Sequence, residues 1–314
     1  MTAPPPARTP SFAHRVEYGA LRSFIGALGL LGRDRALGAG ASLASLGYRP
    51  LGIRRRVVER QIAAAFPGLD PVAVRDIARR CYRHLGAVAV ETALLSRMGP
   101  EQVLSLVERA DNWDLVERTL AQGRGLIAAS GHLGNWELCA AYVAARGIHV
   151  DAVIRRMGNP LFDAYVSRVR SRLGLTVVRD RESVRRTPRT LASGGMVGML
   201  VDQAGLNIAS AYVNFFGRPA KTPRGAAVFA LRFDAPLVFG TALRQPNGRY
   251  HLLIEDIPVV NTGNLERDVD AVVAAYTAVL ERHVRLAPEQ YFWHHRRWKQ
   301  QPADTPPARR DPVV

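Results

Sequence analysis

The sequence predicts an α/β fold in which a mainly parallel sheet is flanked by helices and preceded by a helical N-terminal extension. From about residue 125 onward, short apolar runs alternate with helical patterns, which is typical of a sheet covered by helices. Hydrophobic residues make up 47% of the chain, enough for a substantial core, and this excludes global disorder. One large domain plus the extension accounts for the 314 residues.

Apolar runs mark the expected strands, and helical periodicity marks the segments between them. We expect strands at residues 125–129, 149–154, 176–179, 196–201, 237–242 and 250–255. Helices are expected near residues 135–146, 160–173, 182–193, 223–233 and 267–286. Upstream, the pattern predicts helices over 71–97 and 101–121. Asp70 is suited to cap the first of these two, and Pro71 to occupy its first position.

The order of these patterns divides the chain into four segments. Residues 1–11 are Pro-rich and are expected to be disordered, as is the Pro/Arg-rich tail 302–314. Residues 12–110 form the helical extension, and residues 111–301 form the main α/β domain. The first segment lacks the charged-then-apolar order of a signal peptide.

Residues 12–48 are apolar but interrupted by charges. The uncharged pieces 23–32 and 36–48 are each shorter than the about 20 residues that a membrane-spanning helix needs. This pattern favours an amphipathic helix at a membrane interface, with its arginines toward anionic headgroups. The alternative is that the segment packs against the rest of the protein.

The chain is strongly basic, and nearly all of its positive charge is arginine. Lysine and arginine number 43 against 27 acidic residues, a net charge of +16, and only Lys221 and Lys299 are lysines. Arginine binds phosphate and carboxylate groups bidentately, so an anionic partner is expected: nucleic acid, an acidic membrane, a phosphorylated substrate or an acidic carrier protein. A genome-wide bias toward arginine would explain part of the excess. The two cysteines, Cys81 and Cys139, form neither a metal-ligand spacing nor a disulfide framework.

The most informative motif stands where an apolar run gives way to a helical pattern: Ser130-Gly131-His132-Leu133-Gly134-Asn135-Trp136-Glu137. A histidine with a carboxylate partner is a general base, because the carboxylate fixes the tautomer and stabilises the imidazolium. In a regular helix His132 and Glu137 would lie roughly 140° apart. The pairing therefore requires His132 in the turn before the helix, which the glycines permit. The alternative is an ordinary histidine at a helix start.

Three further blocks follow this motif in order. The first contains Arg155, Asn159-Pro160-Leu161-Phe162-Asp163 and the arginines Arg168, Arg170 and Arg172. The second contains Val201-Asp202-Gln203, the run 213–217 and Ala220-Lys221-Thr222, and the third is the aromatic and basic run 287–299. Together the four blocks resemble the glycerolipid acyltransferase superfamily, with its His-x-x-x-x-Asp/Glu motif, and within it the bacterial lipid A late acyltransferases. The likeness covers most of residues 50–300.

The resemblance implies a general-base dyad of His132 and Glu137. It also implies that Arg170 stabilises the oxyanion of the tetrahedral intermediate, because an arginine follows the Asn-Pro-Leu block in family members. Arg168 and Arg172 compete for that role, since alternating arginines leave the register open.

Four residues are expected to bind substrate: Arg155, Asn159, Asp202 and Arg168. Arg155 and Asn159 follow a predicted strand, where ligand-binding loops gather in open α/β sheets, and are expected to contact a phosphate or sugar. For Asp202, contact with a substrate hydroxyl and support of its loop both stay open. Neither a metal nor a resident cofactor is expected.

The function that the resemblance implies is transfer of a fatty acyl chain from an acyl carrier protein or CoA thioester to a hydroxyl of a membrane glycolipid. A lipid A precursor is the leading acceptor, and phosphatidylinositol mannoside or another glycolipid is the alternative. The expected location is the cytoplasmic face of the bacterial inner membrane, with peripheral or monotopic attachment.

Two other functional classes have weaker support. The aromatic and basic run Tyr291–Lys299 resembles a nucleic-acid stacking surface, but no zinc spacing, helix-turn-helix or RNA-recognition motif accompanies it. Ser130 beside His132 would suit a serine hydrolase, yet the Gly-x-Ser-x-Gly elbow is missing.

Overall fold

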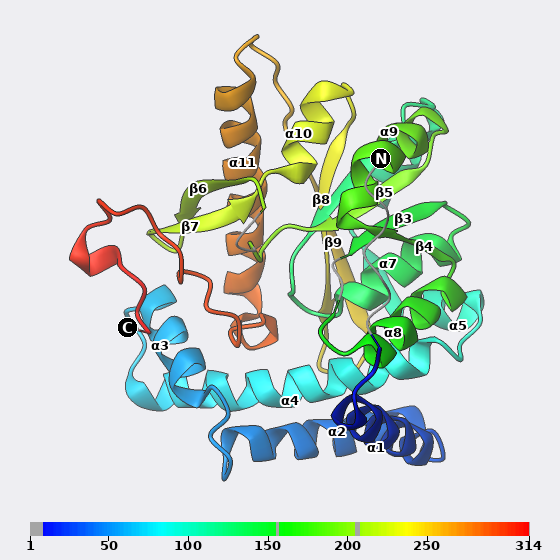
Figure 1. Cartoon of the computed structure of the whole chain (residues 1–314), viewed down its shortest axis with the longest axis vertical. Helices are drawn as coiled ribbons and strands as arrows, with labels where there is room; N and C mark the ends of the chain where they lie inside the picture. Colours follow the sequence, from blue (N-terminus) through cyan, green and yellow to red (C-terminus); the bar gives the residue numbers. More distant parts are fainter. Residues whose placement is uncertain (1–8, 155–156, 205–207, 314) are drawn as a thin grey trace.

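The computed structural model describes residues 9–154, 157–204 and 208–313. Within them lies a seven-stranded sheet with the order β1-β9-β8-β2-β5-β3-β4 (Figure 1). Its strands are β1 (Val107–Ala110), β2 (Leu126–Ser130), β3 (Val150–Ile154), β4 (Leu175–Arg179), β5 (Met196–Leu200), β8 (Leu237–Arg244) and β9 (Tyr250–Asp256). Strands β8, β2, β5, β3 and β4 are parallel, and β9 runs antiparallel to β8. The predicted α/β fold with a mainly parallel sheet is confirmed.

Helices cover both faces of this sheet. They are α7 (Trp136–Ala145), α8 (Pro160–Arg172), α9 (Asp180–Ala192), α10 (Gly225–Arg232) and α11 (Leu265–Leu286). Because side chains alternate along a strand, Leu126 packs into the hydrophobic cluster with α7 and α8, whereas Ile127 packs into the cluster with α10 and α11. The two faces of the sheet therefore carry separate cores.

The N-terminal helical region contains α1 (Phe12–Leu28), α2 (Arg33–Tyr48), α3 (Arg55–Ala65) and α4 (Pro71–Leu95). Asp70 caps α4 by accepting hydrogen bonds from two backbone amides, with Pro71 at the first position, as predicted. Helix α2 lies along α4 (Figure 1), where a Cβ on Gly86 would come within 2.3 Å of the Gly40 carbonyl oxygen. Among the described helices, none has the length and apolar character needed to cross a bilayer.

Two element predictions were wrong. The single helix expected over 101–121 is instead α5 (Pro100–Ser105), strand β1 and α6 (Trp113–Ala121). Strand β1 forms because it pairs with β9, and Asn112 breaks the helical path with a φ of 56°. Phe215-Phe216-Gly217 with Thr222-Pro223 indicates a loop that leads into the helix near residue 223, but this segment is a hairpin of β6 (Ser210–Phe215) and β7 (Arg218–Pro223).

The C-terminal segment has defined contacts where the sequence predicted a disordered tail. Arg296 forms an ion pair with Asp311 at 2.5 Å, and Arg218 donates to the Arg310 carbonyl at 2.7 Å. Thr305 is buried. The segment thus lies against the β6–β7 hairpin in this structure. Of the N-terminal residues 1–11, only Thr9 to Ser11 fall within the described part, and Ser11 caps α1.

Candidate active site

His132 lies in the turn between β2 and α7, where the sequence placed it. Gly134 shapes this turn: its φ is 61°, and a Cβ there would come within 1.9 Å of the Ala242 carbonyl oxygen, so only glycine fits. Asn135 then caps α7, its side chain accepting a hydrogen bond from the Leu138 amide at 3.0 Å. Strand, glycine turn and helix cap together fix the position of His132 at the carboxyl end of the sheet.

The carboxylate partner of His132 is Asp202, which follows the neighbouring strand β5. Strands β2 and β5 are in register with Ser130 opposite Leu200, so the residues that follow each strand meet. Asp202 Oδ1 lies 2.7 Å from His132 Nδ1, and Asp202 Oδ2 accepts from the His132 backbone amide at 3.0 Å. The carboxylate thus holds both the ring and the backbone of the histidine.

Asp202 is almost fully buried, yet it stays a carboxylate. Burial opposes its ionisation, but the interaction with the His132 imidazole, the two hydrogen bonds from that residue and the charge of Arg297 hold the pKa of Asp202 below its ordinary value. With Nδ1 as the donor to Asp202, Nε2 of His132 carries the free lone pair. No protein group in the described residues hydrogen-bonds to Nε2, and the side chain is 21% exposed.

Two aromatic rings flank the His132 imidazole. The Trp136 ring centroid lies 4.9 Å from it, edge to face, and that of Phe292 lies 6.0 Å away. The Phe292 amide also donates to the His132 carbonyl at 2.9 Å. These contacts restrict the ring to one orientation, so that Nε2 is the atom left for a substrate.

The predicted hydrogen bond between His132 and Glu137 is not formed. Both oxygens of Glu137 accept from Arg170 instead, at 2.9 Å from Nε and 2.5 Å from Nη2. Glu137 is the second residue of α7, and its position around the helix turns it toward α8 and away from the turn that holds His132. The carboxylate on the imidazole is therefore that of Asp202, which the sequence assigned to substrate binding.

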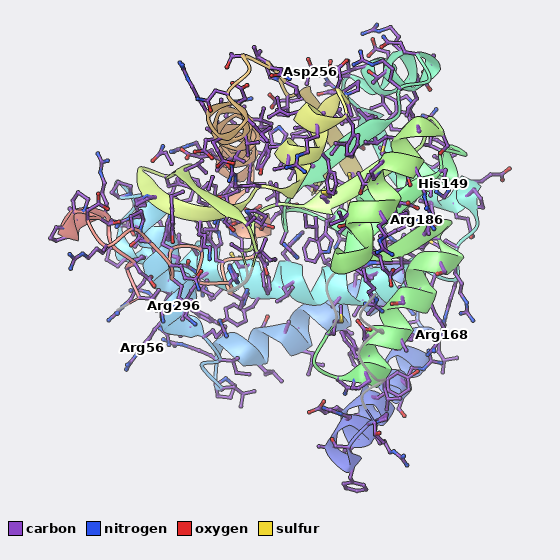
Figure 2. All side chains as sticks on the ribbon, turned by 45° about the horizontal axis from the view of Figure 1, so that its top comes forward. Arg56, His149, Arg168, Arg186, Asp256 and Arg296 are labelled. Carbon is purple, nitrogen blue, oxygen red and sulfur yellow. The ribbon has the colours of Figure 1, made fainter. Side chains whose placement is uncertain are left out.

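Arg170 is the arginine of the three that points inward. Its side chain is buried, whereas Arg168 and Arg172 are exposed, and Figure 2 shows Arg168 at the outer side of α8. Burial alone would lower the pKa of the Arg170 guanidinium, but the charge and hydrogen bonds of Glu137 raise it above its ordinary value. The pair is thus a buried ion pair that joins α7 to α8.

The remaining predicted substrate residues have contacts elsewhere. Asn159 caps α8 and donates to the His14 carbonyl at 3.1 Å and to Glu17 at 3.0 Å, both in α1. Arg168 donates to the Tyr18 hydroxyl at 3.3 Å. Arg155 lies outside the described residues. Substrate binding by these three residues stays a prediction.

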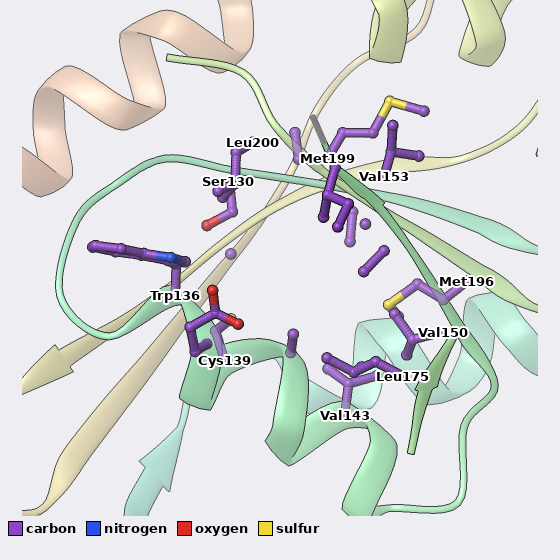
Figure 3. Close-up of a pocket in the computed structure, with 18 of the residues that line it drawn as sticks. Ser130, Trp136, Cys139, Val143, Val150, Val153, Leu175, Met196, Met199 and Leu200 are labelled. Carbon is purple, nitrogen blue, oxygen red and sulfur yellow. The ribbon is translucent and has the colours of Figure 1, made fainter. Parts of the chain in front are cut away.

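An apolar cavity of about 100 Å³ lies between the sheet and helices α7 and α8. Figure 3 shows Ser130 and Trp136 at one end of it and Val150, Leu175 and Met196 at the other. The Glu137–Arg170 pair lies in its wall. The cavity therefore begins beside the His132 turn and extends along the strands toward their amino ends.

This cavity exists because small residues stand side by side in the centre of the sheet. Gly198 of β5 is the direct partner of Ala128 in β2 and of Ala152 in β3. All three line the cavity, and a Cβ on Gly198 would find its nearest neighbour 3.8 Å away. Larger side chains at these positions would close it.

The aromatic and basic run near residue 295 is mostly interior. Trp293 and Trp298 are fully buried, and Arg297 donates to the Lys221 carbonyl and the Thr222 hydroxyl, each at 2.6 Å. Stacking on nucleic bases requires exposed rings, which these two tryptophans do not provide. The run packs the hairpin and α3 against the His132 turn. No three His, Cys, Asp or Glu side chains within the described ranges are grouped to hold a metal ion.

We expect acid to destabilise the fold between pH 6.5 and 4. Burial lowers the pKa of His84, His294 and His295 to about 4 each. In the unfolded chain these imidazoles take up a proton near pH 6.5, so the unfolded state binds more protons as pH falls through this window, and stability falls with it. Melting temperatures at pH 7 and pH 5 measure the effect.

Both ring nitrogens of His294 lack a hydrogen-bond partner in the described part of the chain. The melting temperature of His294→Phe should therefore fall less between pH 7 and pH 5 than that of the parent protein. His14→Gln, at the start of α1, serves as the control and should behave like the parent. An equal acid response in His294→Phe would contradict this assignment.

Comparison with known proteins identifies the family of this chain. Residues 7–300 match the family described as bacterial lipid A biosynthesis acyltransferase. The chain belongs to this family. Among curated members, it is similar to the lipid A biosynthesis lauroyltransferase of Escherichia coli K12, with 26% identity over 85% of this chain and 86% of the relative.

Two further members of the family are similar over most of their length. They are the lipid A biosynthesis palmitoleoyltransferase of Escherichia coli K12 and the lipid A biosynthesis acyltransferase of Shigella flexneri. Each is 24% identical to this chain over 79% of it and 80% of the relative. As a member of the lipid A biosynthesis acyltransferase family, the protein is an acyltransferase.

Proposed function

We propose that the protein transfers a fatty acyl chain from an acyl carrier protein or CoA thioester to a hydroxyl of a lipid A precursor, in lipopolysaccharide biosynthesis. The observation that carries this proposal is the apolar cavity that begins beside the His132–Asp202 pair. A base with a free Nε2 next to an apolar cavity suits a reaction between a hydroxyl and a thioester that bears a long alkyl chain. The names of the curated relatives agree with it.

In this mechanism His132 is the general base. The acceptor hydroxyl donates to Nε2, and its oxygen attacks the thioester carbon as the proton moves to the ring. Asp202 stabilises the imidazolium through Nδ1–H. The tetrahedral intermediate then collapses: the carbon–sulfur bond breaks, and the thiolate takes the proton from Nε2. Because the acceptor itself is the nucleophile, the enzyme forms no acyl intermediate.

Arg170 is the proposed source of charge for the oxyanion. It lines the cavity, and its Nε and Nη2 are held by Glu137. This leaves Nη1 as the donor available to the reaction. In this arrangement Glu137 acts on Arg170 rather than on His132, and a fixed guanidinium in an apolar wall gives strong electrostatic stabilisation.

The proposal is tested with purified protein and acyl carrier protein or CoA thioesters of several chain lengths. A lipid A precursor in detergent is the acceptor, and product masses are read by mass spectrometry. A net charge of +16 suits both the acidic carrier protein and the phosphates of CoA, so the assay compares the two donors directly. Absence of acylated product with every donor would refute the proposed function.

The small residues of the cavity are expected to set the length of the acyl chain. Gly198→Val fills the centre of the cavity, where a new side chain has room. Its turnover should fall at least about tenfold for the longest accepted chain relative to the shortest, because pocket discrimination of this kind is worth about 1–3 kcal/mol per methylene. Gly198→Ala should show a smaller shift. An equal loss for all chain lengths would place the acyl chain elsewhere.

Peripheral membrane attachment is proposed through the helices at the N-terminal side of the protein. The turn between α1 and α2, α2 itself and the loop after α2 carry exposed large apolar side chains: Leu30, Leu31, Leu43, Leu46, Leu51 and Ile53. Exposed arginines occur in the same stretch of the chain: Arg35, Arg49, Arg54 and Arg56. Figure 2 shows Arg56 at the edge of the molecule. Apolar insertion combined with arginine contacts to phosphates fits an anionic bilayer surface.

The membrane prediction is tested by sedimentation with vesicles. The protein should bind vesicles that contain anionic phospholipid, and binding should weaken at high salt because part of the attraction is electrostatic. A variant with Leu43→Asn and Leu46→Asn should bind less yet keep its activity on detergent-dispersed acceptor. Leu286→Asn, at an exposed apolar position in α11, is the matched control. Salt-independent binding that only detergent reverses would contradict peripheral attachment.

A further inference from the structure

A second buried carboxylate, Glu91 of α4, lies behind the His132 turn. Its side chain is fully buried, and three donors from different elements bind it. Asn135 Nδ2 donates to Oε2 at 2.8 Å, the Tyr250 hydroxyl of β9 donates to the same oxygen, and Arg33 Nη2 of α2 binds Oε1. Arg33 also donates to the Gly248 carbonyl at 2.9 Å.

Because Glu91 is buried, its carboxylate requires these hydrogen bonds and the ion pair with Arg33. A carboxylate removed from water is tolerated only when hydrogen bonds and a positive charge compensate for its lost hydration. Arg33 supplies the charge, and Asn135 and Tyr250 supply further donors. Burial and the nearby charge of Glu91 raise the pKa of the Tyr250 hydroxyl, which keeps it in the donor form.

Asn135 is the member of this network that links Glu91 to the His132 turn. Its own side chain is fully buried and has two roles: Nδ2 is held by Glu91, and Oδ1 caps α7 at the Leu138 amide. Its backbone amide donates to the Ala242 carbonyl at 2.9 Å. Asn135 lies between His132 and Glu137 in the sequence. Its orientation therefore fixes the turn that carries the base and the start of α7, whose Glu137 binds Arg170 of α8.

We propose that Glu91 is a positioning residue for acyl transfer: it orients Asn135 and thereby the His132 turn, and it ties this turn to α2 through Arg33. The inference rests on the proposed role of His132. Glu91 itself does not line the cavity. It acts by removing alternative rotamers of Asn135, because only one orientation of that amide satisfies both Glu91 Oε2 and the Leu138 amide.

The test compares Glu91→Gln with Leu95→Ala, a cavity-forming change at a fully buried position of the same helix. Glu91→Gln should lower kcat by tenfold or more with little change in the KM for the thioester, because a glutamine amide cannot accept from all three donors. Leu95→Ala should lower the melting temperature while leaving kcat per folded molecule close to that of the parent. A parental kcat in Glu91→Gln would overturn the proposal, as would a loss no larger than that of Leu95→Ala.

A double variant adds a rescue. Asn135→Asp alone places two carboxylates face to face and should also lower kcat, whereas aspartate remains a good helix cap. Combining it with Glu91→Gln restores a hydrogen bond between the two positions with donor and acceptor exchanged. The glutamine amide introduced at position 91 then donates to the carboxylate introduced at position 135. The double variant should recover most of the kcat lost in each single variant. Independent losses that multiply would contradict the positioning role.

Hydrogen exchange separates this inference from the proposed function. Backbone amides of residues 131–137 should exchange faster in Glu91→Gln than in the parent, and the double variant should restore protection. This result is independent of any substrate. If the parent protein acylates no lipid A precursor but the exchange pattern holds, the proposed function fails and the positioning role stands. Unchanged exchange in Glu91→Gln would refute the positioning role alone.

Discussion

His132→Ala is expected to lower kcat/KM for acyl transfer by on the order of a thousandfold, since general-base catalysis contributes about 10²–10⁴. Without the imidazole, the group proposed to take the proton from the acceptor hydroxyl and return it to the thiolate is missing. The effect should fall mainly on kcat, because the apolar cavity proposed to hold the acyl chain is unchanged. Steady-state kinetics with a detergent-dispersed acceptor measure both constants.

The control for this change is His149→Ala. His149 is half-exposed and contacts Asp151, which keeps Arg186 and Thr190 as partners when the histidine is lost. This variant should retain parental kinetics. His132→Ala should still melt cooperatively, because the ring is only partly buried and its backbone contacts remain. Near-parental turnover in His132→Ala would remove the base from the mechanism.

Asp202→Asn is expected to have an effect of comparable size, on the order of a hundred- to ten-thousandfold in kcat. An amide in place of the carboxylate neither stabilises the imidazolium nor enforces the tautomer, and the same change in a serine protease triad costs about 10⁴. Glu137→Gln should cost less, because the amide oxygen still accepts one hydrogen bond from Arg170. The two variants measured side by side decide which carboxylate serves the base. A larger loss in Glu137→Gln than in Asp202→Asn would reinstate the dyad that the motif spacing indicates.

That exchange of carboxylates shows what the sequence could and could not supply. The sequence placed His132 after one strand and Asp202 after another, and both placements are confirmed. What it lacked was the order of strands: β2 and β5 are neighbours although β3 and β4 lie between them in the chain. Strand adjacency is a long-range property that periodicity does not encode. Once β2 is placed beside β5, the meeting of His132 and Asp202 follows from their equal distance beyond the strand ends.

The same limitation explains the cavity and the hairpin. Ala128, Ala152 and Gly198 are visible in the sequence as small residues in strand centres, but only the register brings them together. Strand β6 has alternating buried and exposed residues, yet Phe215-Phe216-Gly217 followed by Thr222-Pro223 favoured a loop that leads into a helix. By contrast, the cap and first residue of α4 depend on neighbours in sequence, so local chemistry sufficed to predict them.

The turn that holds His132 is closed by a segment from much later in the chain, and this has a consequence for biosynthesis. Leu133 forms a β-bridge with Tyr291, and the Gly134 amide donates to the Gln290 carbonyl at 3.1 Å. On the ribosome, the complete His-to-Glu motif therefore emerges long before the residues that seat it. A nascent chain that ends before residue 290 contains the motif but lacks the segment that closes the His132 turn. We therefore expect the His132 turn to reach its final geometry only after residues 290–292 have left the exit tunnel.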